Sequence, residues 1–184
     1  MYTNDIRALN YALIAEQLEA AFYNQFVSRY MSSDYTSNGF ADASNYLIVV
    51  REHENAHVQF LRMTITQRMG TPVPVCTYNF TVNNISQFIQ TAGALENTGV
   101  KAYNGAIGTI SDPDLILAAA TVVTVEARHA AYLNQLQKLV PFPDITDEAL
   151  SPTVIAGALT AFQTCSFTPD LPVVLNPSTF TPGG

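Results

Sequence analysis

The sequence predicts an all-α protein, a four-helix bundle with a long crossover between its second and third helices. Apolar residues recur at three- and four-residue steps through four long segments, which is the period of an amphipathic helix. The pattern Glu-x-x-His occurs twice, at Glu54–His57 and at Glu126–His129. A Pro-containing stretch rich in β-branched residues, 70–83, separates the second helical segment from the third, and one class of four-helix bundle is connected by such a crossover.

Two long helices are expected in the first half of the chain, from about residue 4 to 31 and from about 41 to 69. The polar, turn-rich segment 32–39 between them is expected to be a short loop, which makes the two helices antiparallel neighbours. Gly70 followed by Pro72 ends the second helix, because Gly is a common helix terminator and Pro cannot continue a helix.

Two further long helices and a short one are expected in the second half. Asp112 as N-cap, with Pro113 at the first helical position, begins the fourth helix, which continues to about residue 140. A fifth helix should run from about 151 to 164. The third helix, over about 85–110, contains glycines that each cost roughly 1 kcal/mol relative to Ala, so close packing must compensate. These glycines are Gly93, Gly99, Gly105 and Gly108.

Length and composition favour one domain. The chain has 184 residues, of which 48% are hydrophobic and 12% charged, which is enough for one well-buried core. We expect the domain over residues 1–165 and an extended Pro-rich tail over 166–184. The net charge of -7 and the lack of a Lys/Arg cluster argue against nucleic acid and anionic membrane surfaces as partners. No apolar run approaches the roughly 18 residues of a membrane span.

An internal repeat relates the first helix pair to the second. Glu16 is followed seven residues later by Tyr23, and Glu96 is followed at the same spacing by Tyr103. Both Glu-x-x-His motifs continue with an aromatic residue and Leu at matching positions. The lone and the motif glutamates all lie roughly 20 Å along their helices at 1.5 Å per residue, a level that antiparallel helices share. The repeat predicts a duplicated helical hairpin with pseudo-twofold symmetry.

The repeated residues predict a dinuclear metal site. Residues three apart lie on one helix face, so each Glu-x-x-His pair can converge on a common point with a lone glutamate from another helix. Two divalent ions balance four buried carboxylates, and neutral imidazoles complete the coordination. Such ligands favour iron or manganese, with zinc as a substitute. The predicted ligands, which are also the candidate catalytic residues, are Glu16, Glu54, His57, Glu96, Glu126 and His129.

Three residues near the lone glutamates are candidates for hydrogen bonds to the ligands. Glu19 lies one turn beyond Glu16, where the alternatives are a further metal ligand or a polar residue at a helix seam. Tyr23 and Tyr103 lie two turns from their glutamates on the same face. For the tyrosines the alternative is a core aromatic residue whose hydroxyl is satisfied elsewhere.

His53 gives the first motif a second interpretation. Together with Glu54 and His57 it spells His-Glu-x-x-His, the zinc-protease motif in which two histidines bind zinc and the glutamate is the general base. That interpretation leaves the second Glu-x-x-His motif unexplained and needs an α+β fold. It is therefore the remote alternative, and we expect His53 to point outward or to contact a ligand.

Cysteines and glycosylation patterns bear on location. Cys76, in the crossover, and Cys165, just past the fifth helix, are too far apart in sequence for a Cys-x-x-Cys motif. They are either two separate buried thiols or a disulfide that ties the crossover to the C-terminal segment, and a disulfide needs an oxidising compartment. Asn79 and Asn84 each begin an N-glycosylation acceptor pattern.

Several segments together carry a family resemblance. They are Leu9-Asn10-Tyr11-Ala12-Leu13, Glu16-x-Leu18-Glu19-Ala20, Glu54-x-x-His57-Val58, Cys76-Thr77-Tyr78-Asn79-Phe80 and Thr124-x-Glu126-Ala127-Arg128-His129-Ala130. In this combination the chain resembles the ferritin-like domain family, in the branch of plant desiccation-related proteins and fungal secreted stress-response proteins. The resemblance covers nearly the whole chain. It implies a ferritin-like bundle, usually exported, often with equivalents of Cys76 and Cys165.

The metal site and the resemblance predict an oxidoreductase that reacts with peroxide or dioxygen in stress protection. The alternatives are iron binding or storage, which requires a closed shell of subunits, and a non-enzymatic stress protein with a structural metal. The first residues do not form a signal peptide. We therefore expect either a mature secreted chain with an added Met1, which the family favours, or a cytoplasmic protein. The expected partners are a small oxidant and a second copy of the chain.

Overall fold

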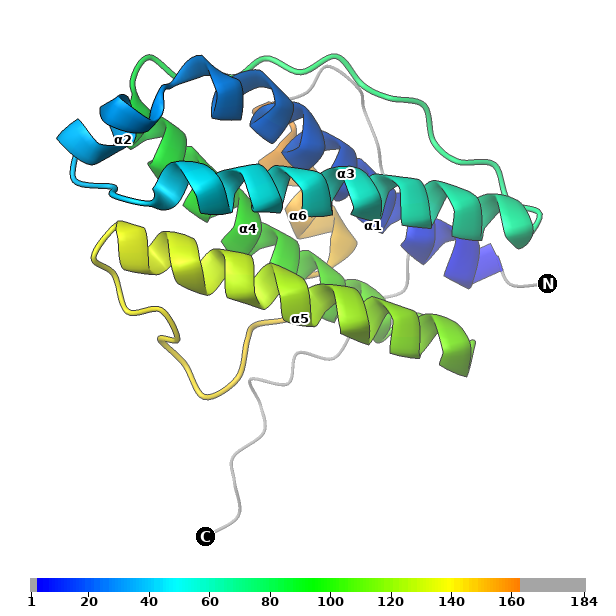
Figure 1. Ribbon diagram of the computed structural model, residues 1–184. Helices are drawn as coiled ribbons and strands as arrows, with labels where there is room; N and C mark the ends of the chain where they lie inside the picture. The colour runs from blue at the N-terminus through cyan, green and yellow to red at the C-terminus, as the bar shows by residue number, and fades with distance from the viewer. Residues whose placement is uncertain (1–2, 163–184) are drawn as a thin grey trace, which may run out of the picture.

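The computed structural model describes residues 3–162, and within them the chain folds as an all-α bundle without strands (Figure 1). The predicted fold class is confirmed. Residues 163–184, which include Cys165 and the predicted tail, lie outside the described part. The elements in chain order are α1 (Thr3–Phe26), a 3₁₀ turn (Val27–Arg29), α2 (Ser32–Ser37), α3 (Ala43–Gln67), α4 (Ile85–Ile107), α5 (Pro113–Leu136) and α6 (Pro152–Leu159).

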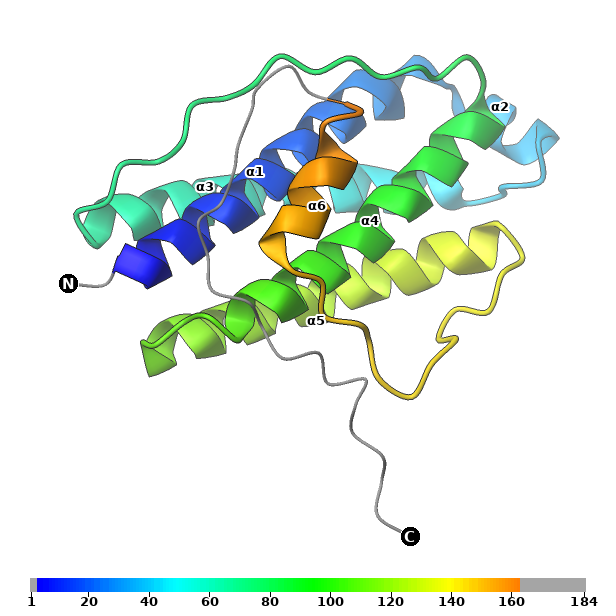
Figure 2. The same cartoon turned by 180° about the vertical axis from the view of Figure 1, so that it is seen from behind.

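The four long helices form two packed pairs. α1 packs against α3, α4 packs against α5, and the two pairs meet mainly along α1 and α4. α3 and α5 lie side by side on the opposite face, toward the viewer in Figure 1, with little direct contact. α6 crosses the outer side of α1 and α4, as Figure 2 shows from behind. One side of the bundle is thus closed by packing, and the α3–α5 side is more open.

The ends of the helices follow their local sequence. Asp112 accepts a hydrogen bond from the Asp114 amide at 2.9 Å, which is the predicted cap of α5, and Asn84 caps α4 through the Gln87 amide at 2.9 Å. The segment expected as a loop at 32–39 instead contains α2. Asp34 stabilises this short helix by accepting a hydrogen bond from the Met31 amide at 2.7 Å.

Two side chains of α1 hold the crossover, Asn10 through two hydrogen bonds and Gln17 through a donation to the Val73 carbonyl at 3.4 Å. The Asn10 amide donates to the Thr71 carbonyl at 3.1 Å and accepts from the Val73 amide at 2.8 Å, so it replaces a strand partner for the extended chain. At the far end of the crossover, the backbone N–H of Asn79 donates to the Phe162 carbonyl at 2.8 Å. The crossover therefore joins the start of α1 to the end of α6, and the predicted Cys76–Cys165 disulfide stays a prediction.

The glycines of α4 lie where neighbours approach closely. A Cβ at Gly105 would come within 1.9 Å of the Leu150 carbonyl oxygen, and one at Gly99 would come within 2.9 Å of Glu19 Oε1. At Gly105 the obstacle is backbone, whereas at Gly99 it is the end of the Glu19 side chain, which would have to move. Packing therefore accounts for the glycines inside α4, which lies between α1, α5 and α6, whereas Gly108, expected within this helix, is the exposed residue just after its end at Ile107.

The core has an aromatic end near the 3₁₀ turn. The Phe22 ring lies 5.1 Å from Phe26, 5.1 Å from Phe80 and 5.5 Å from Phe88. The opposite end is lined mainly by aliphatic residues of α1, α3 and α5. The two ends of the bundle therefore have similar backbones, but one is packed with aromatic side chains and the other mainly with aliphatic ones.

α5 is long and apolar enough to cross a membrane by length and composition, alone among the described helices. It nevertheless packs along α4 and carries a buried Glu126 and a buried His129. A pair of buried ionisable groups at mid-helix is expensive in hydrocarbon. We therefore assign α5 to the bundle.

Candidate metal centre

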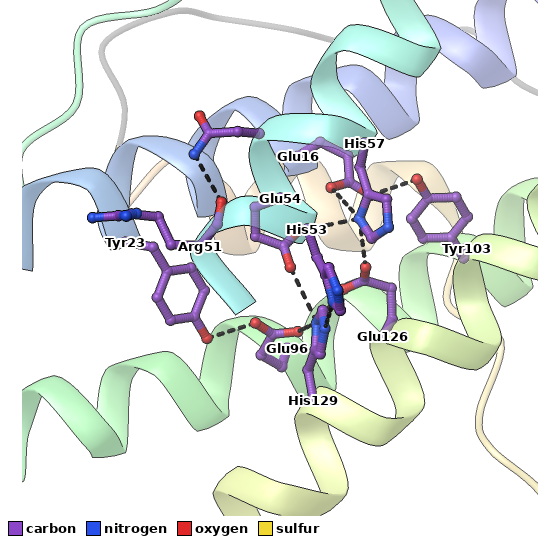
Figure 3. A network of polar contacts seen from close by, with 11 residues as sticks. Glu16, Tyr23, Arg51, His53, Glu54, His57, Glu96, Tyr103, Glu126 and His129 are labelled. Atoms are coloured by element: carbon purple, nitrogen blue, oxygen red, sulfur yellow. Dashed lines mark hydrogen bonds and ion pairs between the residues drawn. The ribbon is translucent and has the colours of Figure 1, made fainter. Parts of the chain in front are cut away.

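The six predicted ligands come together in the middle of the bundle (Figure 3). α1 and α4 each supply one glutamate, and α3 and α5 each supply a Glu-x-x-His pair, which the helical period places on the inward face. All four glutamates have no exposed surface. The cluster thus concentrates acidic groups where water cannot solvate them.

The ligand atoms fall into two groups that share two glutamates. Within each group, one atom from every residue lies within 4.8 Å of the others. Glu54 and Glu126 belong to both groups. The full sets are Glu16, Glu54, His57 and Glu126 in the first group and Glu54, Glu96, Glu126 and His129 in the second.

The shared glutamates each turn one oxygen toward each histidine. Glu54 Oε2 lies 3.4 Å from His57 Nδ1, and its Oε1 lies 3.0 Å from His129 Nδ1. Glu126 Oε1 lies 2.9 Å from His57 Nδ1, and its Oε2 lies 3.9 Å from His129 Nδ1. This is the disposition of carboxylates that bridge two cations.

The other two glutamates are held by tyrosines from the opposite helix pair. Tyr23 on α1 donates a hydrogen bond to Glu96 Oε1 on α4 at 2.5 Å. Tyr103 on α4 donates to Glu16 Oε1 on α1 at 2.5 Å. Their second oxygens face the histidines, since Glu16 Oε2 lies 3.3 Å from His57 Nδ1. Both tyrosines therefore contact ligands, as the sequence predicted, and each one meets the glutamate of the other helix because α1 and α4 pack together.

His53 contacts the outer nitrogen of one ligand. Its Nδ1 lies 2.9 Å from His129 Nε2, with the two rings stacked at a centroid distance of 5.2 Å. His53 belongs to neither ligand group, so the two histidines of the zinc-protease motif do not converge. The residue equivalent to His53 in the second motif is Val125, so His57 has no counterpart of this contact from α5.

Glu19 is buried beside the cluster but belongs to neither group. It is 3% exposed, and its Oε2 has no hydrogen-bond partner. Its equivalent in the second helix pair is Gly99, which leaves the space that Glu19 Oε1 enters. Burial and the charges of the neighbouring glutamates raise the pKa of Glu19 well above its ordinary value. The sequence-based alternative of a seam residue fits this position.

The ionisation of the cluster couples carboxylates to imidazoles. Burial and the charges of other glutamates raise the pKa values of Glu54 and Glu126. Burial alone would lower the pKa of His129, but its contacts with Glu54 and Glu96 outweigh this and raise the pKa to about 10. The pKa of His57 is raised for the same reason, by Glu126, Glu16 and Glu54. Without metal, protons therefore supply the positive charge.

Hydrogen bonds within the protein leave several carboxylate oxygens unsatisfied. His57 Nδ1 faces oxygens of three glutamates, yet one ring nitrogen carries at most one proton. Buried acceptors without donors are costly, and a cation that several oxygens coordinate at once removes that cost. The oxygens without a donor are Glu16 Oε2, Glu54 Oε1 and both oxygens of Glu126. The residues present therefore fit a divalent metal site.

The fold and this cluster define a four-helix bundle with a carboxylate–histidine site. The ferritin-like domain family matches residues 4–139, and the chain belongs to that family, as its sequence segments predicted. The chain is also similar to Protein rds1 of Schizosaccharomyces pombe, with 26% identity over 144 residues that make up 76% of this chain and 34% of rds1. It thus spans about a third of the length of that curated relative.

A solved structure supports the fold alone. The chain resembles the crystal structure of a conserved hypothetical protein, rv2844, from Mycobacterium tuberculosis, with a TM-score of 0.63 and 18% sequence identity. The match covers 74% of this chain and 98% of that one.

Proposed function

We propose that this protein is a dinuclear metal oxidoreductase that reacts with peroxide or dioxygen. The observation that carries the proposal is the pair of shared glutamates, Glu54 and Glu126, each with one oxygen toward each histidine. Two divalent ions would neutralise the four carboxylates of the groups and leave the histidines neutral. Oxygen and imidazole donors without thiolate suit iron or manganese. A protective role under stress and export from the cell rest on the family resemblance.

The residues of the chain have separable tasks around such a centre. Glu16 and His57 would hold one ion, Glu96 and His129 would hold the other, and the shared glutamates would bridge them. When bound, two redox-active ions supply electrons and polarise an O–O bond. Tyr23 and Tyr103 fix the outer oxygens of the terminal glutamates, which would leave the inner oxygens without a tyrosine donor and oriented toward the ions. The surrounding apolar core keeps bulk water from the carboxylates.

Metal analysis tests the proposal. The purified chain reconstituted with Mn²⁺ or Fe²⁺ should hold two ions per chain. Glu126→Gln should hold fewer than two, because one shared carboxylate is lost. Glu148→Gln is the matched control, since Glu148 is an exposed partner of Lys101 outside the cluster and should leave two ions bound. Two ions in the Glu126→Gln variant, or fewer than two in the wild-type chain, would contradict the bridging assignment.

A structural metal is the second candidate function. It is favoured by the thin packing between α3 and α5, which the shared glutamates join across the open face. Activity separates the two functions. Metal-loaded protein that consumes neither peroxide nor dioxygen with a reductant, yet melts far above the metal-free form, would support the structural role. Turnover that requires both ions would support the enzyme.

A further inference from the structure

A small apolar pocket lies beside the metal cluster and is lined by residues of all four long helices, among them Tyr103. Its volume is about 20 Å³, which is room for one molecule of the size of water. Eleven of its twelve lining residues have wholly apolar side chains, and Tyr103 is the exception. The Tyr103 hydroxyl already donates its proton to Glu16, so the pocket offers a guest no free donor from its lining side chains.

The pocket is adjacent to the cluster and to the surface. Val122 lies one helical turn before Glu126, and Phe60 lies about one turn after His57, so both ends of the pocket wall adjoin ligands. Phe60 is 37% exposed and lies over the pocket at the edge of α3. Phe60 and Tyr103 both line the pocket, and Tyr103 donates a hydrogen bond to Glu16, so a guest in the pocket is separated from that ligand by one side chain.

The second helix pair shows that the pocket is built by small residues at particular positions. Applying the repeat, Ala118 corresponds to Tyr46 and Phe60 corresponds to Tyr132. The Tyr46 and Tyr132 rings, with centroids 5.4 Å apart, contact each other between α3 and α5 at the other end, where Tyr46 is 58% exposed. Two further lining residues, Ala8 and Ala106, correspond to the core phenylalanines Phe88 and Phe26. The chain thus closes one side of the cluster with aromatic rings and leaves the other side open.

We propose that this pocket is a binding site for dioxygen, and that dioxygen rather than hydrogen peroxide reaches the cluster through it. Dioxygen is small and apolar and needs no hydrogen bonds. Hydrogen peroxide has two hydroxyl groups, which would lose their hydrogen bonds to water on entering a pocket that has no free donor and one phenolic oxygen. Apolar cavities in proteins stay dry and take up apolar guests, including xenon. The inference rests on the proposed function and names its substrate.

Xenon binding in crystals of the purified protein tests the pocket independently of metal. Xenon should occupy the space beside Tyr103 in the wild-type protein. Ala118→Tyr, which copies the residue at the equivalent position, should abolish that peak. Tyr46→Ala is the matched control at the equivalent position, because the buried Phe26 and Phe88 still fill that side, so the peak beside Tyr103 should stay and no second peak should appear. A wild-type pocket without xenon under pressure would overturn the proposal.

Kinetics of the metal-loaded protein tests the selectivity. Ala118→Tyr should lower the rate of dioxygen consumption by roughly tenfold or more, since filling an apolar pocket removes its occupant, while consumption of hydrogen peroxide stays unchanged. Equal losses with both oxidants, or a wild-type protein that consumes peroxide and not dioxygen, would overturn the inference and leave the metal oxidoreductase standing. If Ala118→Tyr does not fold, Ala118→Leu narrows the same pocket. A chain that binds no metal would refute the proposed function, whereas the xenon result judges the pocket alone.

Discussion

Each terminal glutamate of the cluster depends on a tyrosine that belongs to the other helix pair. The Tyr103 hydroxyl is fully buried and donates to a buried carboxylate, an arrangement that strengthens a hydrogen bond and makes its loss expensive. Tyr11 is equally buried, yet its hydroxyl has no partner. Comparing the two residues separates the contribution of the tyrosine–glutamate hydrogen bond to stability from the contribution of the buried aromatic ring.

Tyr103→Phe should destabilise the metal-free protein by about 2 kcal/mol, because it leaves one oxygen of Glu16 without its donor. Tyr11→Phe should leave the stability unchanged or raise it, since it removes an unsatisfied hydroxyl and keeps the ring. Urea unfolding followed by circular dichroism measures both. Equal destabilisation by the two substitutions would show that the Tyr103–Glu16 hydrogen bond contributes nothing.

His53 should make the two metal positions unequal. Because it contacts Nε2 of His129, it orients that ring so that Nδ1 faces the cluster, and losing such a partner typically costs 10- to 100-fold in metal affinity. His53→Val copies Val125, the equivalent residue in the second motif. We expect one of two binding steps in a Co²⁺ titration to weaken by about that factor, with the other step as internal control. Equal weakening of both steps would show that His53 acts on the bundle as a whole.

At the scale of single elements, α4 shows how packing selects glycine. Gly105→Ala should destabilise the protein by about 3 kcal/mol, because its Cβ meets the backbone carbonyl of Leu150, which cannot move aside as a side chain can. Gly157→Ala, in α6, has open space around the added methyl group and should stabilise by about 0.5–1 kcal/mol. Thermal unfolding compares the two variants. A stabilised Gly105→Ala protein would contradict the close approach of α4 to the backbone of Leu150.

The long helices could be predicted from the sequence because several signals agreed. The apolar period locates the four long helices. Pro113 after the Asp112 cap fixes the start of α5, and the stop at Gly70 fixes the end of α3 to within a few residues. The short helix α2 could not be predicted, because Asp34 caps a segment whose composition is equally suited to turns. α6 ends at Leu159, earlier than expected, since the apolar period continues past the point where the chain turns to meet the crossover.

At the scale of the whole molecule, the cluster sets the response to pH. Glu54 has a pKa raised from 4.5 to about 7, and His129 has one raised from 6.5 to about 10. The folded metal-free protein therefore binds protons more tightly than the unfolded chain. Its stability should therefore fall as pH rises. Loss of the Glu54 proton lowers stability between about pH 4.5 and 7, and loss of the His129 proton lowers it above about pH 6.5.

Melting temperatures of metal-free and Mn²⁺-loaded protein between pH 5 and 9 test this. The metal-free protein should melt lower at pH 8 than at pH 6. The difference in melting temperature between Mn²⁺-loaded and metal-free protein should grow as pH rises, because the metal replaces protons on the same groups. A metal-free protein whose stability rises over this range would show that its carboxylates ionise without penalty.

The ligand set could be predicted because the repeat marks it twice, at one height in four helices. The pairing of each tyrosine with its glutamate could not be predicted, because that pairing depends on the relative direction of α1 and α4. Contact of His53 with a ligand was one of the two expected alternatives, but that the ligand is His129, and that a pocket lies at Ala118, could not be predicted from the sequence. Both depend on the spacing of α3 and α5, which no local pattern encodes.

The division of ligands has an evolutionary meaning. Each ligand group takes three residues from one helix pair and a single glutamate from the other. Two identical copies of one pair would therefore complete both groups, so a dimer of a two-helix chain could hold the same ligand set without duplication and fusion. By the same correspondence, a dimer of the α4–α5 type would place Phe88 and Tyr132 where the present pocket has Ala8 and Phe60, so its two sides would be alike and neither would match this pocket. The aromatic residues then record a specialisation that became available only once the halves could differ.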